Sequence, residues 1–194
     1  MIITTSMLLD ELKQYKAAQN KISRMVSNGE LFPIVKGLYE TDKNTPGHVL
    51  AGAIYGPSYL SFDYALARYQ LIPEAVYNYT SATYFKRKKK TFETDFGVYT
   101  FRDIPTTAFP VGILIETEGA YQFQIASPEK ALCDKLYTLP PALSMKLLEE
   151  LLFDDLRIDL DEFYRLDFTK IKHYAPLYRT TNHKLLLKII RRLE

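Results

Sequence analysis

The side chains best suited to chemistry near the N-terminus recur at helical spacing. At about 100° per residue, Asn20, Arg24 and Ser27 fall on one face of a helix. Lys21 and Ser23 lie at the flanks of that face. Arg can form two parallel hydrogen bonds with guanine, and Asn can do the same with adenine. The face could therefore contact base edges in a DNA major groove. An ordinary solvated helix face is the alternative, and both interpretations remain open for the helix alone.

The elements needed to position this face are a helix, a turn and a hairpin. Ile22, Met25 and Val26 share the opposite side, so the spacing predicts an amphipathic helix over about 19–27. Asn28 and the glycine after it favour the end of that helix, because both residues tolerate a left-handed backbone.

Two apolar runs then follow, Leu31–Val35 and Leu38–Tyr39. The break between them at Lys36 and a glycine predicts a hairpin, and Pro33 restricts its first strand to a sheet edge. Lys36 near the hairpin tip could contact a DNA phosphate. With a further helix predicted over 5–15, this order of elements is typical of a winged helix-turn-helix.

The strongest charge signal is a run of five consecutive cations. The residues are Lys86, Arg87, Lys88, Lys89 and Lys90. One interpretation is a phosphate-binding patch that holds a nucleic-acid backbone. The other is a solvated turn or strand edge that its lysines keep soluble. Beside a candidate winged helix, neither interpretation is favoured.

The polar segment 42–47 contains Pro-Gly and predicts a domain boundary, which gives domains over 1–44 and 45–194. The second domain contains two hairpin patterns, 91–102 and 111–126, and with other runs this predicts roughly five strands, mostly antiparallel by their short connections.

Ser127, Pro128 and Glu129 predict a helix start, as cap, first-position proline and early acid. The remaining chain has helical patterns. The sequence therefore predicts an α+β protein: an N-terminal winged helix-turn-helix, then a mixed α/β domain with mostly antiparallel hairpins and a helical C-terminus.

Composition limits the class of protein. The chain has 194 residues, a net charge of +2 and a single cysteine, Cys133. No internal disulfide can form, which fits a reducing compartment. The N-terminus lacks the features of a signal peptide, and no apolar run is long enough for a membrane span. We therefore expect a cytoplasmic protein without a membrane anchor.

Motifs for catalysis are not found in the sequence. His48, His173 and His183 are far apart, without the spacing of metal ligands. Neither a phosphate-binding glycine loop nor a nucleophile elbow occurs. The sequence thus predicts no catalytic residue, no bound metal and no cofactor. A magnesium-dependent nuclease, in which Glu93, Asp95 and Asp103 of a predicted hairpin converge on the metal, is kept as an alternative.

Several segments, in their order and spacing, resemble the AbiEi family of antitoxins and transcriptional regulators from type IV toxin–antitoxin systems. They are KISRMVSNGEL (21–31), GLY (37–39), SYLSFDYAL (58–66), LIPEAV (71–76), TSAT (80–83), KRKKK (86–90), FETDFGVYTFRDIP (92–105) and IASPEKALCDKLY (125–137). The resemblance runs nearly from end to end of the chain.

The resemblance implies an N-terminal winged helix that binds inverted repeats in its own promoter, double-stranded DNA that two copies could occupy. It also implies a C-terminal domain that counteracts a nucleotidyltransferase-type toxin, AbiEii, without depending mainly on a stable complex. The alternative partner mode is a protein-interaction module that sequesters a toxin through the acidic segment 148–167.

Overall fold

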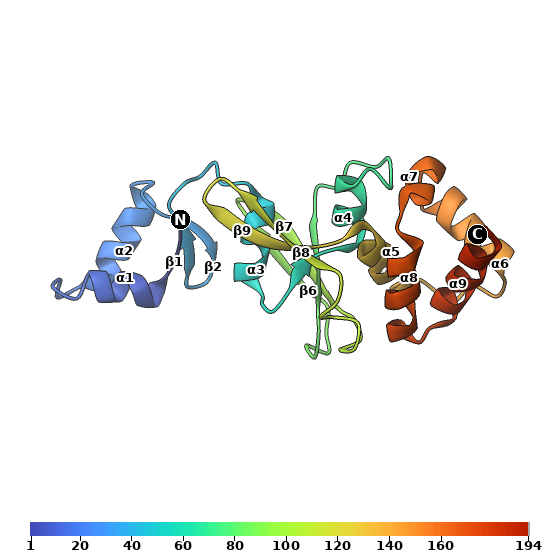
Figure 1. Ribbon diagram of the computed structural model, residues 1–194. Coiled ribbons are helices and arrows are strands. Elements are labelled where there is room, and N and C mark those ends of the chain that lie inside the picture. Colours follow the sequence, from blue (N-terminus) through green and yellow to red (C-terminus); the bar gives the residue numbers. More distant parts are fainter. Residues whose placement is uncertain (194) are drawn as a thin grey trace.

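The N-terminal unit is a small sheet covered on one face by two helices. The computed structural model describes residues 1–193, and this unit lies at one end of an elongated molecule (Figure 1). Its elements are β1 (Ile2–Thr4), α1 (Thr5–Glu11), α2 (Ala18–Ser27), β2 (Phe32–Val35) and β3 (Leu38–Glu40). The strand order is β1-β3-β2, with both pairings antiparallel.

The first helix is shorter than the sequence predicts. It ends at Glu11 rather than near residue 15, and Thr4 caps it by accepting from the Met7 N–H at 3.2 Å. The residues before it form β1, which the sequence did not indicate, because a three-residue strand has too short a pattern to recognise. Leu12 lies just beyond the helix and packs against the core of the unit.

This unit packs on both faces of its sheet. On the helix side, Ile3, Leu8, Ile22 and Leu31 form a separate apolar cluster. On the other side, Ile34 and Leu38 belong to the large core of the remaining chain. The β2–β3 hairpin is therefore shared between a small core and a large one.

A second, six-stranded sheet forms the centre of the molecule (Figure 1). Its strands are β4 (Tyr59–Leu60), β5 (Tyr79–Thr83), β6 (Lys90–Thr94), β7 (Gly97–Asp103), β8 (Ile113–Glu118) and β9 (Tyr121–Ala126). The strand order is β6-β7-β5-β4-β9-β8. The predicted hairpins are present as β6–β7 and β8–β9.

The sheet is more mixed than the expected set of antiparallel hairpins. The hairpins themselves and β4–β5 are antiparallel, but β5 pairs with β7, and β4 with β9, in parallel. The parallel pairs arise because each hairpin joins the sheet through its second strand, which leaves the first strand at the edge. A hairpin pattern predicts that two neighbouring strands pair with each other. It does not indicate which of the two also pairs with the rest of the sheet.

Helices cover both faces of the central sheet. A 3₁₀ turn (Gly47–Leu50) and α3 (Ala51–Ile54) lie on one face. On the other face lie α4 (Phe62–Arg68) and α5 (Pro128–Tyr137). The Ser127 cap of α5 is confirmed, since its side chain accepts from the Lys130 N–H.

The C-terminal part is helical, as expected. It consists of α6 (Met145–Glu150), a π-helical turn (Leu151–Asp155), α7 (Leu160–Arg165), α8 (Phe168–Tyr174), a 3₁₀ turn (Ala175–Tyr178) and α9 (Thr181–Leu193). The last residue of the expected domain 45–194, Glu194, lies outside the described residues. No helix in residues 1–193 combines the length and the apolar character that crossing a bilayer would need.

The segment between the two sheets is closely packed. Glu40 at the end of β3 is fully buried, and its carboxylate accepts from the backbone N–H groups of Thr41 (2.8 Å) and Asp42 (3.3 Å). The Gly47 carbonyl accepts from the Tyr99 hydroxyl at 2.8 Å. A Cβ at Gly47 would lie 2.3 Å from the Phe96 carbonyl oxygen, so only glycine fits this approach.

Candidate functional site

The structure places α2 with the two faces that the sequence predicts. Asn20, Ser23, Arg24 and Ser27 are exposed, and Lys21 is half-buried. On the opposite side Ile22 is buried, while Met25 and Val26 are half-buried against the small core. The polar groups of α2 are thus held toward solvent by the burial of its apolar side.

Local contacts leave these polar groups able to bind a ligand. Ser23 and Ser27 each donate to the carbonyl four residues earlier, at 3.2 Å and 3.0 Å, so their oxygens can still accept a hydrogen bond. The Lys21 ammonium lies 6.0 Å from the Tyr15 ring centre. Within residues 1–193, no carboxylate forms an ion pair with Arg24, so its guanidinium is available to an external acceptor.

Lys36 occupies the exposed turn between β2 and β3. The turn is possible because Gly37 adopts a positive φ of +83°. The Gly37 carbonyl also accepts from the Thr5 N–H at 2.9 Å, which fixes the hairpin turn against the start of α1. The cation therefore projects from a rigid hairpin.

The cationic run belongs to the central sheet rather than to the N-terminal unit. Lys86, Arg87, Lys88 and Lys89 lie in the loop before β6, and Lys90 is the first residue of β6. In Figure 1, β6 lies in the middle of the molecule and α2 near one end, so the run and the α2 face are in separate places.

The five cations of the run differ in the contacts that they make. Lys86 donates to the Gly56 carbonyl at 2.9 Å and lies 4.7 Å from the Tyr55 ring centre. The backbone N–H of Arg87 donates to Asp103 at 2.6 Å. Lys88 and Lys89 are exposed, and their ammonium groups form no ion pair with a residue that the structure describes. The exposed Arg87 side chain likewise forms no ion pair with a described residue, so Arg87, Lys88 and Lys89 are the cations most available to a phosphate.

The acids of the nuclease alternative do not converge. Glu93 is opposite Val98 on β7, and Asp103 is five residues further along the same strand. At about 3.3 Å per residue, this separates the two residues by roughly 17 Å along the hairpin. In the part of the chain that the structure describes, no three His, Cys, Asp or Glu side chains gather as they would around a metal ion.

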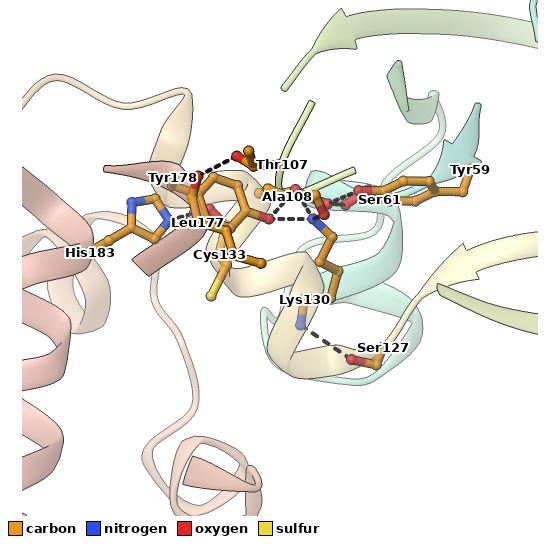
Figure 2. Close-up of polar contacts among 11 residues, drawn as sticks. Tyr59, Ser61, Thr107, Ala108, Ser127, Lys130, Cys133, Leu177, Tyr178 and His183 are labelled. Carbon is orange, nitrogen blue, oxygen red and sulfur yellow. Dashed lines mark hydrogen bonds and ion pairs between the residues drawn. The ribbon is translucent and has the colours of Figure 1, made fainter. Parts of the chain in front are cut away.

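Sequence reasoning missed a buried polar centre around α5, shown in Figure 2. Lys130 and Asp134 are one helical turn apart, and both are fully buried. The signal that could have indicated them is a lysine and an aspartate at i, i+4 within an otherwise apolar helix face. Two charges in such a place must be paired to be tolerated.

Every charged atom of the centre has partners. The Lys130 ammonium donates to Asp134 (3.0 Å), to the Ala108 carbonyl (2.9 Å) and to the Tyr178 hydroxyl. The Asp134 carboxylate accepts from Ser61 (2.7 Å) and Tyr59 (2.9 Å) at one oxygen. Its other oxygen accepts from Tyr178. These contacts join β4, α5 and the turn before α9.

Burial sets the protonation states around this centre. It raises the pKa values of Tyr59 and Tyr178 well above their ordinary value, and the negative charge of Asp134 adds to the effect. Burial also raises the pKa of the Cys133 thiol, so this thiol stays protonated and is a core residue. Closed to solvent and fully bonded, the centre links the central sheet to the C-terminal helices.

His183 extends the centre toward α9. Its ring stacks on Tyr178 with 4.2 Å between ring centres (Figure 2). The Cys133 carbonyl lies 2.9 Å from its Nε2, and the Thr180 hydroxyl lies 2.6 Å from its Nδ1. Because a carbonyl only accepts, Nε2 carries the proton and Nδ1 accepts from Thr180. Burial lowers the pKa of His183 to about 4, which keeps the ring neutral.

Comparison with known proteins adds no relative: no family model matches this chain, and no curated protein matches it in sequence.

We predict that Asp134→Ala lowers the free energy of unfolding by about 3–5 kcal/mol, because it leaves the Lys130 charge buried without its partner. Urea denaturation measures this change. Asp154→Ala, which removes an exposed acid, is the control and should change stability by less than about 0.5 kcal/mol. Equal, small effects of the two substitutions would contradict the assigned role of Asp134.

We predict a second effect from His183. Its folded pKa of about 4 lies below the unfolded value near 6.5, so the unfolded chain binds the extra proton first on acidification. Stability should therefore fall as the pH drops from about 6.5 to 4, with His183 contributing about 2–3 kcal/mol.

In His183→Gln this share of the pH dependence should vanish, whereas His173→Gln, at an exposed site, should retain it. Urea denaturation at both ends of the pH window gives the comparison. An identical pH slope in the two variants would refute the assignment.

Proposed function

We propose that this chain is a sequence-specific DNA-binding protein in which α2 is the recognition helix and the β2–β3 hairpin is the wing. One observation carries the proposal: α2 exposes Asn20, Arg24 and Ser27 while burying Ile22, next to a hairpin that exposes Lys36. Arg24 is the central residue of this surface, because it is exposed and can bind guanine bidentately.

The arrangement supports this function in its shape as well as its chemistry. A major groove about 12 Å wide admits one α-helix. The α1–α2 pair lies at one end of the elongated molecule (Figure 1), so the rest of the chain leaves this approach open. Lys36 on the rigid hairpin would add a phosphate contact, which positions the helix without reading sequence.

The biological role we propose is that of an antitoxin that represses its own operon and counteracts a nucleotidyltransferase-type toxin. The resemblance to the AbiEi family supports it, because the matching segments cover the N-terminal unit and the central sheet with α5. Inverted repeats in the promoter would bring two copies onto one DNA site. Repression and antitoxicity would then reside in different parts of the chain.

A second candidate is direct binding of a toxin by the acidic segment 148–167. It is favoured by the exposed apolar side chains of Leu160 and Tyr164 within the segment, and by exposed Leu147, which lines one hollow with the exposed acids Asp154 and Asp155. Against it, Glu149 is paired with Arg192, and Glu162 with Arg165, inside the same domain. Co-purification with the product of the neighbouring gene would favour this candidate, and separate elution would argue against it.

We predict that Arg24→Ala weakens binding to the DNA upstream of the gene by about 1–3 kcal/mol, because one bidentate base contact is lost. A band-shift titration measures the change. The control is Arg191→Ala, which removes an exposed cation from α9, far from α2. If Arg24→Ala binds this DNA as tightly as the parent protein does, α2 is not the recognition helix.

We predict that Lys88→Ala with Lys89→Ala reduces the salt dependence of DNA binding for all sequences alike. Each lost phosphate contact should lower the slope of log K against log salt by about 0.9. Titrations at several salt concentrations, on specific and unrelated DNA, give the slope. A slope equal to that of the parent protein would show that the loop before β6 does not contact DNA.

A further inference from the structure

A hollow of about 460 Å³ lies between the central sheet and the helices α4 and α5. Its volume is within the range of about 300–1,000 Å³ that small-molecule sites occupy. Strands β5, β6 and β7 supply its floor, and α4 with the C-terminal end of α5 supplies its wall. The hollow belongs to the central sheet and shares no residue with the α2 face, so the inference below does not rest on the proposed function.

Strand register gives the floor a row of hydroxyl groups. Thr100 on β7 is directly opposite Thr80 on β5 and Thr91 on β6. Residues opposite one another in a sheet point to the same face, so the three hydroxyls lie abreast. Arg102, two residues beyond Thr100, also points to this face.

Cations surround the row. Lys89, Lys90, Arg102 and Lys135 line the hollow with one carboxylate, Asp63, which leaves a net charge of +3. Lys135 is paired with Asp63 at 2.5 Å. Arg102 forms no ion pair with any residue of the described chain 1–193 and is half-buried. A half-buried guanidinium without a carboxylate partner, next to the hydroxyl groups of Thr91 and Thr100, is suited to a phosphate.

The backbone of the wall is strained. Phe62 lines the hollow and has a φ of +54°, which is rare for a bulky side chain. The floor holds this conformation, because Thr80 accepts from the Tyr64 N–H (3.0 Å) and donates to the Ser61 carbonyl (2.6 Å). Strain that neighbouring groups maintain is concentrated at ligand sites.

A second hollow of about 300 Å³ adjoins the first and shares Lys89, Arg102 and Thr138 with it. It adds Arg87, Lys88, one carboxylate (Asp103, which accepts from the Thr83 hydroxyl and the Arg87 N–H) and Tyr137, which is 37% exposed. Cations beside an exposed aromatic ring are the groups that bind a phosphate and stack on a base.

We propose that the joined hollows bind a nucleoside monophosphate. Its phosphate would contact Arg102 and Lys90 beside the hydroxyls of Thr91 and Thr100, and its sugar would lie where the hollows meet, near Lys89 and Thr138. The base would lie against the Tyr137 ring. Lys89 in the loop before β6 and Lys90 at the start of β6 both line the hollow. The cationic run would therefore bind a ligand other than duplex DNA.

Isothermal titration of the full chain with the monophosphates of adenosine, guanosine, cytidine and uridine tests the proposal. We expect at least one of them to bind saturably with one site per chain. Arg102→Gln should weaken that binding by at least about tenfold, because a charge-assisted contact is lost. Lys184→Gln, which removes an exposed lysine of α9, should leave it unchanged.

Thr100→Val provides a second variant, which removes a floor hydroxyl without removing charge and should weaken binding even if Arg102→Gln fails to fold. The proposal is overturned if none of the four nucleotides saturates below about 10 mM. It is equally overturned if the folded variants bind as the parent does. Tighter binding of a short 5′-phosphorylated single strand than of any mononucleotide would identify a nucleic-acid end as the occupant and refute the small ligand.

Discussion

The fold depends on one buried carboxylate, Asp134. Its two oxygens accept hydrogen bonds from β4, from α5 itself and from the turn that precedes α9. Sheet and C-terminal helices must therefore meet at one point with the geometry that these bonds require. A buried charge pair adds little net stability compared with apolar packing, but losing one partner is costly. The main effect of the polar centre is therefore to fix how the central sheet and the C-terminal helices pack together. Its contribution to the net free energy of unfolding is smaller.

The N-terminal unit depends on a different constraint, the sharing of one hairpin between two cores. Its own cluster is small, because only Ile3, Leu8, Ile22 and Leu31 are buried there. Ile34 and Leu38 instead join the core of the central sheet. A small unit with so little apolar burial gains stability from this second contact. The orientation of α2 is thus tied to the central sheet through β2 and β3.

Features governed by neighbouring residues could be predicted from the sequence. The Ser127 cap, the hairpins β6–β7 and β8–β9, and the burial of Ile22 all depend on residues a few positions apart. The parallel pairings depend on contacts between distant segments, as does the polar centre, where Tyr59 meets Asp134 across 75 residues. For the same reason the sequence showed a cationic run but not the hollow that two of its lysines line, since that hollow requires the register of three strands.

The close fit at Gly47 has a mechanical consequence. Gly47 packs closely against Phe96 and Tyr79, and its carbonyl accepts from the Tyr99 hydroxyl. These contacts fix the segment that connects the two sheets, so we expect the sheets to keep one relative orientation. The protein then resembles a rod with α2 near one end and α6–α9 at the other (Figure 1). Any macromolecule held by α2 would leave the far helices projecting into solvent at a set distance and angle. Substitutions at one end of the molecule could then change what that end binds without changing what the other end binds.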